Sequence, residues 1–322
     1  MKKALIIGIN DYPGSPLFGC VNDAKAVEAI LQVNGDGSPN METDLQTNVP
    51  TRARLLELVA QLFSGSRLVS LLYFSGHGYY NNRNGFLVTP DAKAYDEGVR
   101  MDDIIQLANA SEATNKVIIL DCCFSGALAE GNAAGGTSIS IREGVTILTA
   151  SRKSEPAMEA GGQGLFTGLL LQALSGGAAD IRGHVSPGSI YAYIDQALGE
   201  SGQRPVFKTN IIRFISLRDV VPQLAPGVLR KLTEYFPDPG QPHLLDPSYE
   251  DTNTPEWEPL KMEPYAIPEN VKRFKDLQQL QSVGLLVPED APFMYFAAMR
   301  NKSCRLTPLG LHYWNLVKKR KV

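Results

Sequence analysis

The chain has 322 residues, of which 43% are hydrophobic and 20% charged, and its formal net charge is −3 at pH 7. This balance is that of an ordinary globular protein, and the charge excludes a general attraction to nucleic acids or acidic membranes, though not a local contact with them. No apolar run is long enough to span a membrane, and the run that begins at Ala4 is too short for a secretory signal. The four cysteines show neither CxxC nor metal-finger spacing, so we expect a reduced, cytoplasmic protein.

The first two thirds of the chain alternate short β-rich runs with helical patterns. In chain order, the expected elements are helices at 21–31 and 51–63, strands at 68–74 and 85–88, a helix at 101–107, a strand at 116–120, helices at 164–175 and 186–198, and a strand within 206–217. Thr51 is a plausible N-cap for the second helix. Strands that alternate with helices favour an α/β fold, in which a mostly parallel sheet has helices on both faces.

Two of the apolar runs end in loops that carry reactive side chains. The run at 68–74 leads into Ser-Gly-His-Gly, which contains His77, and the run at 116–120 leads into Asp-Cys-Cys-Phe-Ser-Gly, which contains Cys123. In open parallel sheets, ligands bind and chemistry occurs at the carboxyl ends of strands. These loops can therefore place an imidazole beside a thiol, which is the arrangement that activates a cysteine nucleophile.

The two loops resemble the catalytic motifs of the caspase and metacaspase superfamily, and they are most similar to its bacterial metacaspase-like, or orthocaspase, branch. Stretches at 3–10 and 19–24 resemble the first strand and first helix of that family. The stretch at 145–151 resembles the strand after the catalytic cysteine, and 164–167 resembles the start of the next helix. The resemblance covers about residues 1–217 and implies a caspase-like fold and a cysteine endopeptidase.

The resemblance also implies roles for individual residues. Cys123 would be the nucleophile, and His77 would take its proton and later protonate the leaving amine. The backbone N–H groups of Gly78 and Cys123 would stabilise the oxyanion. Because neighbouring residues of a strand point to opposite faces, only one of Cys122 and Cys123 should face the site. The family pattern selects Cys123, and Cys122 is then expected to be a packed thiol.

Asp121 lies two residues before Cys123, so both are expected on one face of the sheet. In metacaspase-like enzymes the matching Asp and the Asp of a Cys-x-Asn-Asp stretch, here Asp23, form an acidic pocket for the Arg or Lys before the cut. Two carboxylates match a guanidinium well. Ser75 and Cys20 resemble wall residues of the same pocket. The alternatives are helix capping for Asp23 and plain packing for the other two.

Calcium is a possible ligand, because many metacaspases bind it near the position of Asp102 and Asp103. Ca²⁺ requires six to eight oxygen ligands, yet the nearby stretch 81–84 carries asparagines where the family often has acidic residues. The site looks incomplete. We therefore expect that the protein requires no cofactor. We expect the negative charges of the two aspartates to stabilise the first turn of their helix.

The composition changes after about residue 220. Residues 221–268 are rich in proline, which predicts a connector with little regular structure between a peptidase domain at 1–220 and a regulatory or sensing domain at 269–322. The elements expected in the last domain are a helix at 270–285, a two-stranded ribbon from 293–299 and 304–307, and a helix at 308–317. This order resembles a winged-helix-like module.

The leading hypothesis is a cysteine endopeptidase that cleaves proteins after Arg or Lys and is held in check by its C-terminal region. A small ligand, a nucleic acid or a partner protein would then activate it, and the resemblance implies a role in bacterial stress or antiviral defence. One alternative is a catalytically inactive binding module. Another is a DNA-binding regulator acting through residues 269–322, whose helix carries Lys272, Arg273 and Lys275; a salt-dependent DNA shift would favour it.

Overall fold

The computed structural model describes residues 1–81, 84–93, 96–122, 140–150, 159–160, 163–199, 205–211, 215–256 and 262–322, apart from the side chains of 159, 160 and 163. These residues divide into two compact units, Met1–Val221 and Pro222–Val322. Each unit has its own secondary structure and core.

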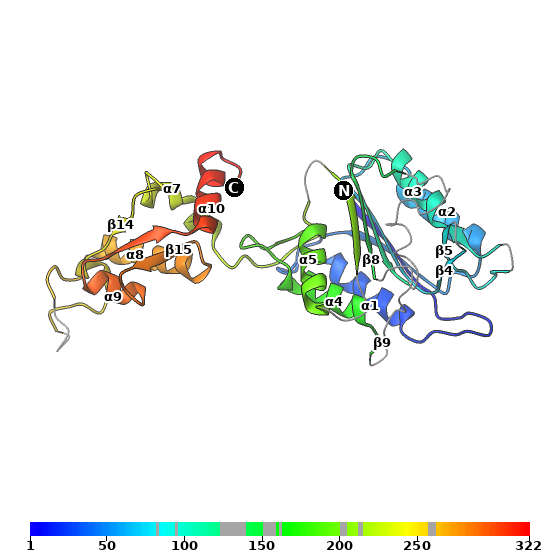
Figure 1. Cartoon of the computed structure of the whole chain (residues 1–322), viewed down its shortest axis with the longest axis horizontal. Helices are drawn as coiled ribbons and strands as arrows, with labels where there is room; N and C mark the ends of the chain where they lie inside the picture. Colours follow the sequence, from blue (N-terminus) through cyan, green and yellow to red (C-terminus); the bar gives the residue numbers. More distant parts are fainter. Residues whose placement is uncertain are drawn as a thin grey trace. The chain divides into compact units, whose positions relative to one another are not determined.

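The first unit is built on a six-stranded sheet with the order β12-β8-β7-β3-β1-β2 (Figure 1). Its strands are β1 (Lys2–Gly8), β2 (Glu42–Thr47), β3 (Val69–Ser75), β7 (Asn115–Asp121), β8 (Val145–Thr149) and β12 (Val206–Asn210). Neighbouring strands run parallel except for β12, which is antiparallel to β8. Every residue of β3 and β7 is buried, as expected for strands that are covered on both faces. The predicted mostly parallel α/β fold is confirmed.

Helices cover both faces of this sheet (Figure 1). One face carries α1 (Cys20–Gln32), α4 (Leu165–Gln172) and α5 (Pro187–Leu198), and the other carries α2 (Arg52–Phe63) and α3 (Met101–Ala110). Tyr73 packs in the first core and its neighbour Phe74 in the second, which follows the two-residue period of a strand. The Thr51 side chain accepts a hydrogen bond from the Arg54 N–H, so it is the N-cap of α2 as predicted.

Small β elements extend beyond the central sheet. A three-stranded antiparallel sheet of β4, β5 and β6 follows the end of β3, and β4 was not predicted from the sequence. The remaining elements of this unit are β4 (Gly78–Tyr80), β5 (Gly85–Leu87), β6 (Val99–Arg100), β9 (Glu159–Ala160), β10 (Gln163–Gly164), the π-helix η2 (Ala173–Gly177), β11 (His184–Val185) and β13 (Arg218–Asp219).

The second unit begins at Pro222, so residues 222–268 belong to a compact unit and are not a connector between two domains. Its elements are α6 (Pro226–Arg230), α7 (Leu232–Tyr235), β14 (His243–Leu244), the 3-10 helix η3 (Pro247–Tyr249), α8 (Pro268–Ser282), β15 (Leu286–Glu289), α9 (Met294–Met299), β16 (Ser303–Leu306) and α10 (Pro308–Lys318). The Trp314 indole donates to the Phe236 carbonyl at 2.7 Å, and the Tyr235 hydroxyl donates to Asp276 at 2.6 Å. Three of the prolines, Pro226, Pro247 and Pro268, stand in the first turn of a helix, where proline is well tolerated.

The ribbon of the second unit also differs from the prediction. The segment expected as a strand at 293–299 is the helix α9, and the strands that pair with β16 are β14 and β15. Met294, Ala297 and Ala298 are buried, and their spacing is that of one helix face. The winged-helix resemblance and the regulatory role of this region stay predictions.

Candidate active site

The carboxyl ends of β3 and β7 lie side by side, as the sequence analysis expected. The two strands are paired in parallel with Ser75 opposite Asp121, and the Gly76 N–H donates to the Asp121 carbonyl at 3.4 Å. Cys123 lies outside the described residues. Cys122 is 1% exposed and packs in the core on the α2 and α3 face, which is the packed position expected for it.

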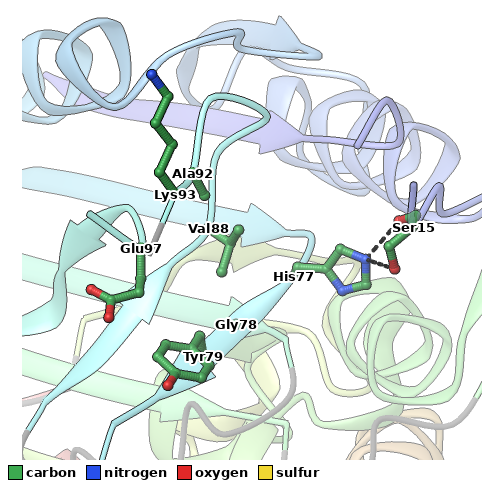
Figure 2. A pocket seen from close by; sticks show the side chains of 8 residues that line it. All are labelled: Ser15, His77, Gly78, Tyr79, Val88, Ala92, Lys93 and Glu97. Carbon is green, nitrogen blue, oxygen red and sulfur yellow. Dashed lines mark hydrogen bonds between the residues drawn. The ribbon is translucent and has the colours of Figure 1, made fainter. Parts of the chain in front are cut away.

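The loop at 9–19, between β1 and α1, fixes the ring of His77. His77 Nε2 is 2.8 Å from the Ser15 carbonyl oxygen and 3.2 Å from the Ser15 hydroxyl (Figure 2). A carbonyl oxygen can only accept a hydrogen bond, so Nε2 carries a proton in this arrangement. In the neutral ring, Nδ1 is then left as the acceptor, and it is the nitrogen available to take a proton from a thiol.

Tyr12, from the same loop, holds the backbone of His77. The Tyr12 hydroxyl accepts from the His77 N–H at 3.0 Å and donates to the Val88 carbonyl at 3.2 Å, and the two rings are 4.5 Å apart between centroids. Burial raises the pKa of Tyr12, so the hydroxyl stays protonated and can donate. Neither Tyr12 nor Ser15 was predicted from the sequence. The only signal available was their place in the loop that follows the first strand, at the ligand-binding edge of the sheet.

Two carboxylates converge on one buried point near this loop. Asp23 on α1 is 1% exposed, and Asp121 at the end of β7 is 7% exposed. A methyl group placed on Gly164 would lie 2.6 Å from Asp121 Oδ2 and 3.2 Å from Asp23 Oδ2. Both side chains therefore face the same small space in front of the Gly164 Cα. The structure brings together the two aspartates that the sequence assigned to one acidic pocket.

Neutral donors orient these carboxylates. The Ser75 hydroxyl donates to Asp23 Oδ2 at 3.4 Å, the Gly164 N–H lies 3.3 Å from both Asp23 oxygens, and the Thr167 hydroxyl donates to Asp121 Oδ2 at 2.5 Å. These hydrogen bonds hold the oxygens of both side chains in place. Burial, followed by the Asp121 and Asp23 charges, raises the pKa of Tyr73 well above its ordinary value.

The remaining predicted site residues lie apart from this pair or beside it. Cys20 is buried at the start of α1, three residues before Asp23, and its role as a pocket wall stays a prediction.

Asp102 and Asp103 lie in the first turn of α3, where Asp102 is paired with Arg100 at 3.4 Å. Burial raises the pKa of Asp102. Within the part of the chain that the structure describes, no group of three or more His, Cys, Asp or Glu side chains could hold a metal ion. A calcium site at Asp102 and Asp103 stays a prediction.

An open pocket of about 630 Å³ adjoins His77 (Figure 2). The hairpin of β4 and β5 and the loop that follows it supply most of its walls. Its lining residues are Ser15, His77, Gly78, Tyr79, Val88, Ala92, Lys93 and Glu97. Gly78, predicted as an oxyanion donor, thus lies at the edge of an accessible cavity.

Comparison with known proteins agrees with this architecture. The crystal structure of protein GSU0716 from Geobacter sulfurreducens matches with a TM-score of 0.51 and 17% identity, covering 69% of this chain and 100% of that one, which shows a shared fold. A search of curated proteins found no match. No helix among the described residues is long and apolar enough to cross a membrane. The family model of the caspase domain matches residues 1–214. Since that match spans well over half of the sequence, the protein belongs to the caspase family of cysteine peptidases.

Proposed function

We propose that the protein is an endopeptidase that cleaves polypeptides after Arg or Lys, with Cys123 as its nucleophile and His77 as its general base and acid. The observation that carries the proposal is the convergence of the Asp23 and Asp121 carboxylates on one buried point. That point lies at the strand ends that lead into His77 and Cys123. A planar guanidinium can bond two carboxylates at once, and the Lys ammonium can satisfy them as a point charge.

The reaction needs only groups that this chain supplies. Nδ1 of His77 takes the thiol proton of Cys123, and the thiolate attacks the carbonyl carbon of the scissile bond. The backbone N–H groups of Gly78 and Cys123 stabilise the resulting oxyanion. His77 then gives its proton to the nitrogen of the scissile bond, the C–N bond breaks and the amine leaves. Water hydrolyses the remaining thioester and frees the thiol.

The experiment that tests the proposal is a panel of fluorogenic peptides ending in Arg, Lys or Asp. The full chain is assayed with and without Ca²⁺, beside Cys123→Ala as the inactive control. We expect release after Arg and Lys, none after Asp, and a loss of at least about a thousandfold in the variant, because the nucleophile is removed. Release after Asp but not after Arg would contradict the assignment of the acidic pair.

Tyr12→Phe is expected to lower kcat about tenfold and to leave KM nearly unchanged. The substitution removes one hydroxyl and leaves the His77 N–H and the Val88 carbonyl without their partner, at a cost of about 1–3 kcal/mol. The hydroxyl holds the histidine rather than the substrate, so turnover should suffer more than binding. Steady-state kinetics on an Arg peptide measure both constants.

Tyr193→Phe is the matched control, because it removes a hydroxyl that donates to the exposed Gln172 side chain. If both variants keep the full kcat, Tyr12 does not position His77. A rise in KM with unchanged kcat would assign Tyr12 to substrate binding instead.

A further inference from the structure

The pocket beside His77 has no role in the reaction as described so far. Among the described residues, its lining does not include Asp23 or Asp121, the pair proposed to hold the Arg or Lys side chain. Its volume of about 630 Å³ is within the range of about 300–1,000 Å³ typical of ligand pockets. It is therefore large enough to receive an amino-acid side chain.

Its lining combines apolar and aromatic side chains with the polar Ser15 and the charged Lys93 and Glu97. Tyr79 on β4 is 43% exposed, and its ring lies 6.1 Å from the ring of Phe86 on β5. Phe86 is buried and lies directly opposite Tyr79 on the neighbouring strand. Val88 and Ala92 complete the apolar surface, while the Lys93 amino group points away from His77 (Figure 2). An exposed aromatic ring next to a catalytic histidine offers a surface for a large apolar group.

The chemistry indicates which part of a substrate lies there. His77 must protonate the amine that leaves, so the first residue after the cut has its nitrogen next to the His77 ring. The residue before the cut has its side chain at the two aspartates. The cavity is lined by His77 but, among the described residues, by neither aspartate. We therefore place it on the side of the scissile bond from which the amine leaves.

We propose that this pocket binds the side chain of the residue immediately after the scissile bond, and that it selects a large apolar or aromatic residue through Tyr79. This inference rests on the proposed peptidase function, and it adds a second specificity site to it. A larger apolar side chain buries more surface against Tyr79 and Val88, which lowers the barrier for that substrate.

The test uses the full chain and a mixture of peptides that vary on both sides of the cut, with the products sequenced. Quenched peptide pairs with Arg before the cut and either Phe or Gly after it then give the rates. We expect kcat/KM about tenfold higher for Phe than for Gly. Tyr79→Ala should reduce that ratio to about twofold or less. Leu68→Ala, an exposed apolar residue at the opposite end of β3, should keep it.

Equal rates for Phe and Gly, or a preference that survives Tyr79→Ala, would overturn the inference. The residues before and after the cut are read separately, so a failure of the Arg or Lys assignment is distinguished from a failure of this pocket.

A binding measurement decides the inference without turnover. The chain has four histidines, and His77→Ala identifies the His77 ring proton in an NMR spectrum. The product-like tripeptide Phe-Ala-Ala-amide should shift that signal at lower concentration than Gly-Ala-Ala-amide does, and it should lose this advantage in Tyr79→Ala. No shift with either tripeptide would overturn the proposal.

Discussion

Asp121→Asn is expected to lower kcat/KM for peptides with Arg before the cut by about two to three orders of magnitude. Asp121 and Asp23 face one buried space, and in the proposed complex the substrate guanidinium would lose one of its two carboxylate partners there, at a cost of about 2–5 kcal/mol. Asn keeps the size of the side chain and can still accept the Thr167 hydroxyl bond, so the change removes charge rather than volume. Peptide kinetics measure the loss.

The contrast between Arg and citrulline peptides isolates the charge. Citrulline has the shape of Arg without its charge, so the wild-type protein should strongly prefer Arg, and Asp121→Asn should lose most of that preference. Asp44→Asn on the edge strand β2 is the matched control, since it removes a carboxylate that accepts from Gln46 on the same strand. If the two variants behave alike toward both peptides, the acidic pair does not bind the substrate cation.

Gly164→Ala is expected to abolish most cleavage after Arg, with a loss of about a hundredfold. Gly164 has φ −64° and ψ 133°, which alanine adopts without strain, so the effect comes from the added methyl group alone. That methyl would lie 2.6 Å from Asp121 Oδ2 and 3.2 Å from Asp23 Oδ2. It fills the space where the substrate cation would bind, and overpacking costs about 1–3 kcal/mol of stability.

Thermal unfolding and peptide kinetics together measure this change. Gly227→Ala is the matched control, because a methyl group there has no atom within 4 Å, and both its stability and its activity should stay near the wild-type values. Full activity toward Arg in Gly164→Ala would show that the substrate does not enter between the carboxylates.

The parts of the fold that the sequence predicts best are those with a strong local pattern. The apolar runs of β3 and β7 are recognisable because every residue is buried, and their ends show where His77 and Asp121 lie. Tyr12 and Ser15 stand in a loop without periodicity. Their contacts with His77 depend on how distant segments pack, which local sequence does not encode.

The wrong predictions have a related cause. Proline was interpreted as evidence of a linker at 221–268, but a proline in the first turn of a helix is equally well placed, and only the surrounding contacts distinguish the two. Short segments such as 293–299 are ambiguous between helix and strand from their apolar residues alone. The packing of the second unit decides in favour of a helix.

If Asp121 binds the substrate cation as proposed, the alignment of β7 against β3 makes correct assembly of the sheet a condition for substrate selection. Asp121 faces the α1 side, while its neighbours Leu120 and Cys122 face the opposite, apolar core. A slip of one position would exchange these sides and force a carboxylate into that core, which is strongly unfavourable without hydrogen-bonding partners. Misaligned chains would therefore be unstable and unable to recognise Arg at the same time, so a wrongly folded copy would not become a peptidase with altered specificity.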